Sequence, residues 1–356
     1  MIFMTELISE DIKNWVAQKI KQQTNSTEFV LVPLAGDASA RRYYRVIQDE
    51  KTSEKTSEKT WVLMLWVPFS QAEYPFLSVQ RHFSACHVQV PEIIAIGEAL
   101  GALLLEDLGD LTLERKFWES AKSESSEEFY LKTIDELIKI HDVTTYSAIK
   151  STASVTKFDP AKFLWEMNYA KENLLLELLN VKLNAADAAE LNSAFVNFCT
   201  LLAEKPKVIC HRDFHSRNVM LKRNKVIIID FQDARLGPVQ YDLVSLFKDS
   251  YVDIDDAYAT KLMNYYLQNS NIKKTRNFSE EDFFKTYELQ SLQRCFKACG
   301  SFASFMNQRR DTRYLKYLAP TLRRVFKALA HFPEYSILNK ILIDAGALEK
   351  KFESLS

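Results

Sequence analysis

Residues 208–218 read Val-Ile-Cys-His-Arg-Asp-Phe-His-Ser-Arg-Asn, and residues 227–232 read Ile-Ile-Ile-Asp-Phe-Gln. Each stretch is an apolar run that ends in polar residues, which is typical of a buried strand leading into a loop. Asp213 precedes Asn218 by five residues, and Asp230 follows at the end of the second run. A loop and an adjacent strand end can bring these three side chains together. Their oxygens form a ligand set that suits a Mg²⁺ ion beside phosphate groups.

The chain has a different character on the two sides of this segment. The first 108 residues contain helical patterns at 9–22 and 70–85, and they contain five strand-like runs, at 29–34, 43–47, 61–67, 93–96 and 102–105. From about residue 125 the apolar residues follow helical spacing, in segments near 127–141, 159–179, 184–205, 253–269, 279–309 and 313–331. We therefore expect an α+β protein with a small antiparallel β-rich lobe, residues 1–108, and a large mainly helical lobe, residues 109–356. The catalytic loop, residues 208–235, would lie in the second lobe.

The segment Lys51–Thr60 is polar and repeats Lys-Thr-Ser-Glu between two strand-like runs. Such a low-complexity sequence cannot bury apolar surface. We expect residues 50–60 to form a flexible, solvent-exposed hairpin loop without a specific function.

Composition excludes several classes of protein. The chain has only seven glycines in 356 residues, and none has the spacing of a P-loop or of a dinucleotide-binding fingerprint. The net charge of −1 gives no sign of nucleic-acid or anionic-membrane binding. Five scattered cysteines fit free thiols, and no apolar run is long enough to span a membrane. We expect a cytoplasmic protein and a monomer.

The motif His-Arg-Asp, four residues, then Asn, followed by a strand that ends in Asp-Phe, resembles the phosphotransfer site of kinases. The chain resembles the aminoglycoside phosphotransferase and choline kinase branch of the protein-kinase-like fold. It looks most like the bacterial anomeric kinases that phosphorylate N-acetylmuramate and N-acetylglucosamine in cell-wall recycling. The stretches that support this resemblance are 34–45, 103–109, 211–218, 229–237 and 292–300.

The resemblance implies an enzyme that uses ATP and Mg²⁺ and a small-molecule sugar acceptor. Asp213 would orient and deprotonate the acceptor hydroxyl, and His211 would brace the loop. Asn218 and Asp230 would hold Mg²⁺, and Asp242 would anchor the catalytic loop. The turn over the ATP phosphates would comprise Gly36, Asp37, Ala38 and Ser39, and the hinge beside adenine would comprise Glu106, Asp107 and Leu108.

One departure from the protein-kinase pattern concerns the third strand, residues 62–66, which has no lysine to meet the phosphates. Some cation must offset the phosphate charge. Arg41, Arg42 and Arg45 are the candidates nearby.

The acceptor is less sharply defined by the sequence. Residues 271–332 hold thirteen Lys or Arg against five Asp or Glu, whereas residues 159–204 hold seven acids against three bases. The basic region favours a neutral or anionic acceptor, and we expect Arg217, Arg294 and Lys297 to contact it. Two alternatives stay open. One is an aminoglycoside, choline-like or amino-acid kinase, and the other is a pseudokinase that serves as a binding module.

Overall fold

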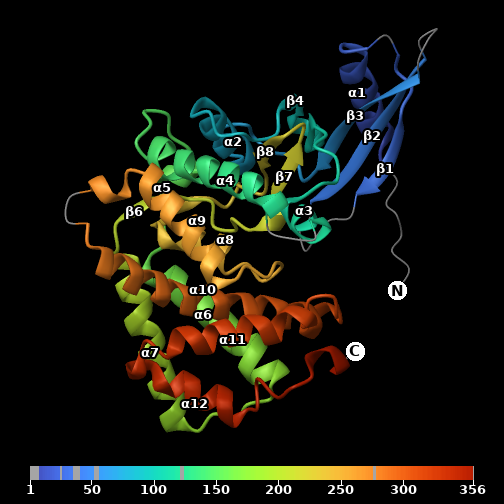
Figure 1. Ribbon diagram of the computed structural model, residues 1–356. Coiled ribbons are helices and arrows are strands. Elements are labelled where there is room, and N and C mark those ends of the chain that lie inside the picture. The colour runs from blue at the N-terminus through green and yellow to red at the C-terminus, as the bar shows by residue number, and fades with distance from the viewer. Residues whose placement is uncertain are drawn as a thin grey trace.

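The computed structural model describes residues 8–24, 26–34, 41–51, 56–120, 124–275 and 278–355. The N-terminal lobe contains an antiparallel sheet with the strand order β1-β2-β3-β5-β4 (Figure 1). Its strands are β1 (Val30–Leu34), β2 (Arg42–Lys51), β3 (Thr56–Leu65), β4 (Ile93–Gly97) and β5 (Ala102–Glu106), and its helices are α1 (Glu10–Lys21) and α2 (Pro75–Ala85). The five strands and both helices were expected from the sequence, and the structure confirms them.

The two faces of this sheet are covered by different elements. Side chains of neighbouring residues alternate between the faces of a strand. Leu63 of β3 and Leu104 of β5 therefore share one apolar cluster with Val16 of α1. Met64 and Leu103 belong to a second cluster on the other face, which includes residues of α2 and of the helical lobe. The sheet is thus held between α1 and the rest of the molecule.

The hairpin between β2 and β3 differs from the expected loop at residues 50–60. The strands continue into the polar segment, and Lys51 pairs with Thr56 at the end of the ladder. Backbone pairing needs no apolar side chains, so the polar repeat extends the hairpin there. Residues 52–55, within the expected loop, lie outside the described part of the chain.

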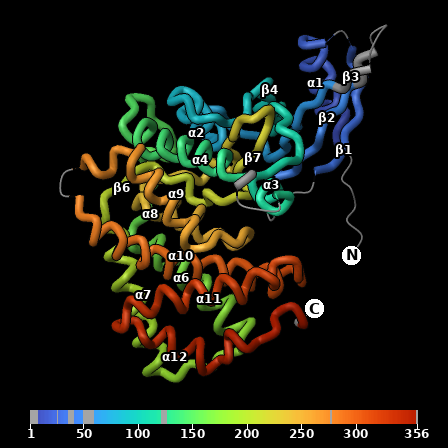
Figure 2. The backbone as a smooth tube through the Cα atoms, viewed as in Figure 1, coloured from blue at the N-terminus to red at the C-terminus, as the bar shows by residue number. Residues whose placement is uncertain are grey.

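The C-terminal lobe is mainly helical. Its helices are α3 (Leu113–Glu119), α4 (Glu124–Ile138), α5 (Thr152–Val155), α6 (Pro160–Ala170), α7 (Ala185–Glu204), α8 (Gln240–Phe247), α9 (Asp256–Asn269), α10 (Glu280–Arg309), α11 (Leu318–Leu329) and α12 (Ser336–Asp344). The long helix α10 runs beside α6, α8 and α11 (Figure 2). It crosses α6 closely, because a Cβ atom at Gly300 would lie 2.3 Å from the Cα of Ala170. The expected fold class, α+β with a β-rich lobe and a helical lobe, is confirmed.

Four short strands of the helical lobe frame the segment that opened the sequence analysis. They are β6 (Lys207–Cys210), β7 (Val219–Lys222), β8 (Lys225–Ile228) and β9 (Arg235–Pro238). β6 pairs with β9, and β7 pairs with β8, in both cases antiparallel. The loops between them carry the candidate catalytic residues. No helix among the described residues combines the length and apolar character that a membrane span requires. The boundary between the lobes at residue 108 stays a prediction.

Candidate active site

The loop after β6 is fixed by Asp242 of α8, a fully buried residue. Its carboxylate accepts the backbone N–H groups of His211 (2.7 Å) and Arg212 (2.9 Å). Nε2 of the buried His141 lies 3.2 Å from the same carboxylate. Arg212 has φ +84°, a backbone conformation that is costly for a residue with a side chain. The hydrogen bonds to Asp242 hold this bend, and the bend positions the next residue, Asp213.

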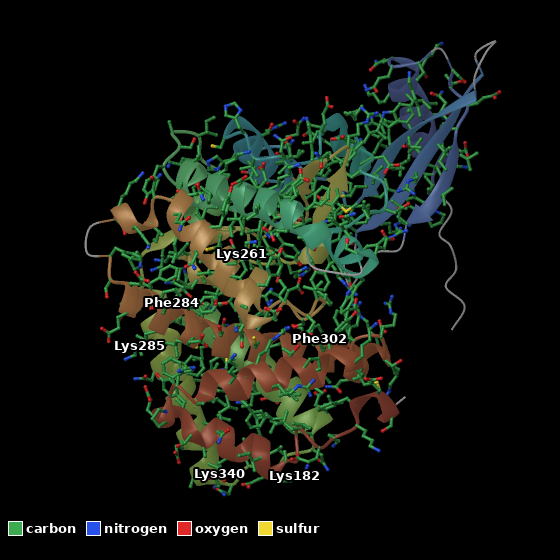
Figure 3. The ribbon with its side chains drawn as sticks, in the orientation of Figure 1. Lys182, Lys261, Phe284, Lys285, Phe302 and Lys340 are labelled. Atoms are coloured by element: carbon green, nitrogen blue, oxygen red, sulfur yellow. The ribbon has the colours of Figure 1, made fainter. Side chains whose placement is uncertain are left out.

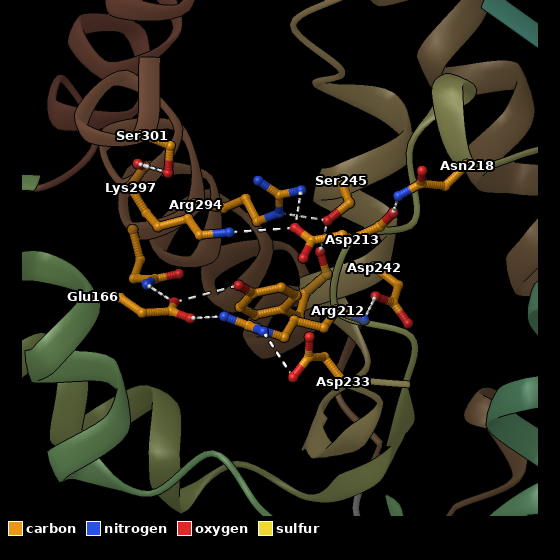
Figure 4. Close-up of polar contacts among 12 residues, drawn as sticks. Glu166, Arg212, Asp213, Asn218, Asp233, Asp242, Ser245, Arg294, Lys297 and Ser301 are labelled. Atoms are coloured by element: carbon orange, nitrogen blue, oxygen red, sulfur yellow. Dashed lines mark hydrogen bonds and ion pairs between the residues drawn. The ribbon is translucent and has the colours of Figure 1, made fainter. Parts of the chain in front are cut away.

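Asp213 lies among cations. Its Oδ1 is 3.4 Å from Nη2 of Arg294 and 3.3 Å from Nζ of Lys297, both on α10 (Figure 4). Burial alone would raise the pKa of Asp213, but the charges of Lys297 and Arg212 hold that pKa well below its usual range. The side chain is nevertheless 29% exposed. Asp213 is therefore an ionised carboxylate that a ligand can reach.

Asn218 and Asp230 offer oxygens close to Asp213. The side-chain amide of Asn218 donates to the backbone carbonyl of Asp213 (2.9 Å), which leaves the amide oxygen of Asn218 as an acceptor. Burial and then the charge of Asp213 raise the pKa of Asp230, while a hydrogen bond from Gln232 (2.9 Å) opposes the rise. A carboxylate whose pKa is raised, beside a second carboxylate, lacks positive charge, and a divalent cation would supply it. The chemistry of these donors fits Mg²⁺.

His211 connects the two parts of this site. Its Nε2 lies 2.9 Å from the carbonyl oxygen of Ile229, the residue before Asp230. A protonated Nε2 donates to that carbonyl, so the imidazole joins the loop of Asp213 to the loop of Asp230. The bracing role expected for His211 stays a prediction.

A cavity of about 510 Å³ lies between the sheet and the catalytic loop, and we call it the interlobe cavity. Its volume falls within the range of ~300–1,000 Å³ that is usual for small-molecule sites. Asn218 and Asp230 lie on its wall, as does the segment Glu106–Gly109 that follows β5. Most of the remaining wall is apolar and comes from both lobes: Leu34, Val62, Phe76, Pro91, Leu105, Met220, Ile229 and Phe231. An apolar cavity with oxygen ligands at its edge suits a nucleotide.

Arg45 lines the interlobe cavity, but two carboxylates already hold it. Its guanidinium forms salt bridges with Asp107 (2.7 Å) and Asp110 (2.8 Å). The hydrogen bonds to Asp110 and Asp107 raise the pKa of Arg45. Asp107 also accepts the backbone N–H of Gly109 (2.9 Å). Arg45 therefore fastens the segment after β5 to β2, at a place other than the candidate Mg²⁺ ligands.

Arg41 and Arg42 are the other two candidates for the cation that offsets phosphate charge, and they differ in their surroundings. Arg42 is exposed and does not line the interlobe cavity, because it alternates with Tyr43 along β2. Arg41 is affected by Asp230: burial alone would lower the pKa of Arg41, but Tyr43 and Asp230 are among the groups that raise it. Of the three arginines, Arg41 thus acts most directly on a candidate Mg²⁺ ligand. Gly36, Asp37, Ala38 and Ser39 lie outside the described residues.

On the other side of Asp213 lies a smaller cavity of about 130 Å³, which we call the inner cavity. Arg294, Lys297 and Lys248 line it together with Asp213 and several uncharged side chains. Its other lining residues include His215, Ser245, Asp249, Tyr251, Ser301 and Phe302. Figure 3 shows where this part of the wall lies along α10, since Phe302 is far from the end of the helix that bears Phe284 and Lys285. The carboxylate of Asp213 therefore faces a space with an excess of positive charge.

Arg217 occupies a neighbouring position. Its guanidinium pairs with Glu114 (2.9 Å) and donates to the hydroxyl of Tyr317 (2.9 Å). It also lies 3.9 Å above the ring of Tyr251. Two of the three expected acceptor contacts, Arg294 and Lys297, thus line the inner cavity, and Arg217 does not.

Residues that the sequence analysis did not identify also hold the site. Nη2 of Arg212 lies 3.6 Å from the buried Glu166 of α6, and Nη1 lies 3.4 Å from Asp233 (Figure 4). Asp249, buried after α8, accepts the backbone N–H of Ser216 (2.8 Å) and so fixes the loop a second time. No local pattern marks these acids, because their partners lie 21 or more residues away in the chain.

Comparisons with known proteins agree with this arrangement. A model described as the phosphotransferase enzyme family matches residues 30–278, well over half of the chain. The N-acetylmuramate/N-acetylglucosamine kinase of Neisseria meningitidis serogroup B is 27% identical over 343 residues, covering 94% of this chain and 96% of that protein. The protein of the same name from Pseudomonas aeruginosa is 29% identical over 319 residues, covering 88% of this chain and 87% of that protein.

Solved structures resemble the chain in fold. A choline/ethanolamine kinase family protein from Mesorhizobium loti has a TM-score of 0.56 at 15% identity, covering 95% of this chain and 98% of that chain. The ADP-bound aminoglycoside phosphotransferase APH(2'')-Ib has a TM-score of 0.55 at 15% identity, covering 91% of this chain and 98% of that chain. At this identity the similarity shows the fold alone.

Proposed function

The chain belongs to the phosphotransferase enzyme family, and we propose that it transfers the γ-phosphoryl group of ATP to the anomeric hydroxyl of an N-acetylated amino sugar. N-acetylmuramate and N-acetylglucosamine are the proposed acceptors, because two relatives that align along most of the chain are named for them. One observation carries the proposal: Asp213 lines the inner cavity, while Asn218 and Asp230 line the interlobe cavity beside it.

In this proposal the nucleotide occupies the interlobe cavity, with adenine beside Glu106, Asp107 and Leu108. A structural neighbour of the same fold is ADP-bound, which supports the use of an adenine nucleotide. Asn218 and Asp230 hold Mg²⁺, which when bound supplies positive charge to the nucleotide phosphates. Gly36, Asp37, Ala38 and Ser39 are proposed to cover the phosphates, with Arg41 as the nearby cation.

Asp213 is the proposed catalytic residue. Its Oδ1 lies toward Arg294 and Lys297, which leaves Oδ2 to accept the hydrogen bond of the acceptor hydroxyl. A carboxylate with a lowered pKa is a weak base, so its main task is to orient the hydroxyl until the proton becomes acidic during transfer. Arg294 and Lys297 keep this carboxylate ionised, and His211 keeps its loop in place.

The charges of the inner cavity also separate the candidate acceptors. Arg294, Lys297 and Lys248 face this space with the acids Asp213 and Asp249. A polycationic aminoglycoside would meet like charges there, which is unfavourable. A neutral sugar, or one with a carboxylate, avoids this repulsion. We propose Arg294 and Lys297 as acceptor contacts, and a cytoplasmic monomer as the working form.

A ³¹P NMR assay tests the proposal directly. ATP, Mg²⁺ and the protein are incubated with N-acetylmuramate, N-acetylglucosamine, kanamycin or choline. We expect a new anomeric phosphate signal with the two sugars alone. Asp213→Asn should lower kcat by about 10²–10⁴-fold, the range of general-base catalysis. Transfer to kanamycin or choline in place of the sugars, or ATP binding without any transfer, would contradict the proposal.

A further inference from the structure

A second space lies beside the inner cavity. It has a volume of about 410 Å³ and is lined by Glu114, Trp118, Tyr251, Lys316 and Tyr317, and we call it the outer hollow. Tyr251 lines both spaces. The inner cavity, at about 130 Å³, is smaller than the usual ligand site of ~300–1,000 Å³. An acceptor with a second part needs a further space, and the outer hollow offers one next to the shared residue Tyr251.

Trp118 is the most unusual residue of the outer hollow. Its side chain is 60% exposed, although a large aromatic ring gains free energy from burial. It is also held in place, because its indole N–H donates to the backbone carbonyl of Tyr251 (3.0 Å) and its ring contacts Phe117 edge to face (5.2 Å). An exposed ring in a fixed orientation is a preformed surface for a flat apolar partner.

The remaining wall combines aromatic faces with polar groups. The rings of Tyr251 and Tyr317 meet edge to face with centroids 5.0 Å apart, and Arg217 packs on both rings. Glu114 and Lys316 supply an acceptor and a donor in the same space. A sugar ring has an apolar face of C–H groups and a rim of hydroxyls, and this wall matches both parts.

We propose that the outer hollow is a subsite for a second sugar ring, and that the protein phosphorylates the reducing end of a disaccharide of N-acetylated amino sugars. This rests on the proposed function, because the anomeric hydroxyl of the first ring must lie at Asp213. Carbon 4 of that ring then points away from Asp213, and a 1,4-linked second ring extends toward Trp118. The anomeric oxygen bonds to the γ-phosphorus of ATP as the bond to the β-phosphate oxygen breaks. The hydroxyl proton passes to Asp213, and ADP leaves.

The test compares N-acetylglucosamine with its β-1,4-linked dimer, N,N′-diacetylchitobiose, as acceptors. We expect phosphorylation of both. Trp118→Ala should lower the ratio of the dimer's kcat/KM to that of the monomer about tenfold, as expected for the loss of one aromatic contact. The matched control is Tyr146→Ala, a 71% exposed aromatic side chain that lines neither space, and it should leave the ratio unchanged.

Each contrary outcome has a separate meaning. Phosphorylation of the monomer without the dimer overturns the subsite and leaves the proposed function standing, whereas phosphorylation of neither overturns both. An equal loss on both acceptors in Trp118→Ala gives the residue a structural role and overturns the subsite. A third acceptor, N-acetylmuramyl dipeptide, separates sugar from peptide: if Trp118→Ala impairs that compound selectively and spares the dimer, the hollow takes a peptide and the sugar subsite is wrong.

Discussion

Replacing Glu166 tests how the loop of Asp213 is held in place. The residue is 1% exposed and lies 3.6 Å from Nη2 of Arg212. Gln293 and Tyr241 donate to its Oε2 at 3.0 and 3.3 Å, whereas its Oε1 has no hydrogen-bond partner among the described residues. Glu166→Gln preserves the volume and an oxygen acceptor while removing the charge. Within the described part of the chain, Arg212 then keeps one carboxylate partner, Asp233.

The expected loss of stability in Glu166→Gln follows from this geometry. Breaking a fully buried ion pair costs about 3–5 kcal/mol. Arg212 is 15% exposed and retains Asp233, so we expect a loss of about 2–3 kcal/mol in the free energy of unfolding. In a lobe of this size that loss lowers Tm by about 5–10 °C. Because Arg212 directly precedes Asp213, kcat should also fall, by about tenfold, with KM for ATP changed less than about twofold.

Differential scanning fluorimetry and steady-state kinetics measure the two effects. The control is Glu172→Gln, since that side chain is 56% exposed and lies 3.8 Å from Lys171, a geometry worth less than about 1 kcal/mol. The double variant Glu166→Gln/Arg212→Met removes the unpaired charge, so its loss should be smaller than the sum of the single losses. A Glu166→Gln protein with the Tm and kcat of the control would refute this account of the buried pair.

Three further predictions concern pH, packing and the loop anchor. Burial lowers the pKa of His215 to about 3, so the folded state favours the neutral ring. The stability that this ring contributes is complete above about pH 6.5 and is lost as the pH falls toward 3, by up to about 1.4 kcal/mol per pH unit. In urea titrations at several pH values, His215→Asn should flatten this dependence of the free energy of unfolding on pH. Gly300→Ala should lower the free energy of unfolding by about 1–3 kcal/mol, because the new Cβ would lie 2.3 Å from the Cα of Ala170. The control is Lys285→Ala, an exposed position on the same helix, which should change the free energy of unfolding by less than about 0.5 kcal/mol. Asp242→Ala leaves the backbone N–H groups of His211 and Arg212, one buried and one part-buried, without this acceptor. It should lower the free energy of unfolding by about 2–5 kcal/mol in chemical denaturation, and an unchanged midpoint would contradict its anchoring role.

Local features of the sequence were sufficient for the five strands of the N-terminal lobe, for most of the long helices and for the central motif, but not for short elements such as α3, α8 and β9. Three of the expected helical segments begin at residues 9, 159 and 184, and the side chains of Ser9, Asp159 and Asn184 each accept a backbone N–H in the first turn. Caps and apolar periodicity act within a few residues, so they can be read along the chain. Asp213 and Asn218 were identified for the same reason: their spacing is short, and the chemistry of a metal–phosphate site constrains it. The roles of these two residues stay predictions.

The surroundings of Asp213 depended on tertiary structure. Arg294 and Lys297 were expected from the sequence only as acceptor contacts, yet they are 81 and 84 residues from the carboxylate that they approach. Arg45 was expected near phosphate, but its partner Asp107 is 62 residues away. Such contacts depend on how α10 crosses the catalytic loop and how β2 faces the hinge, and helix periodicity does not encode either. The sequence by itself therefore determined which groups are the candidates for the chemistry, because their spacing is local. Only the packing of distant elements decided which charges surround them.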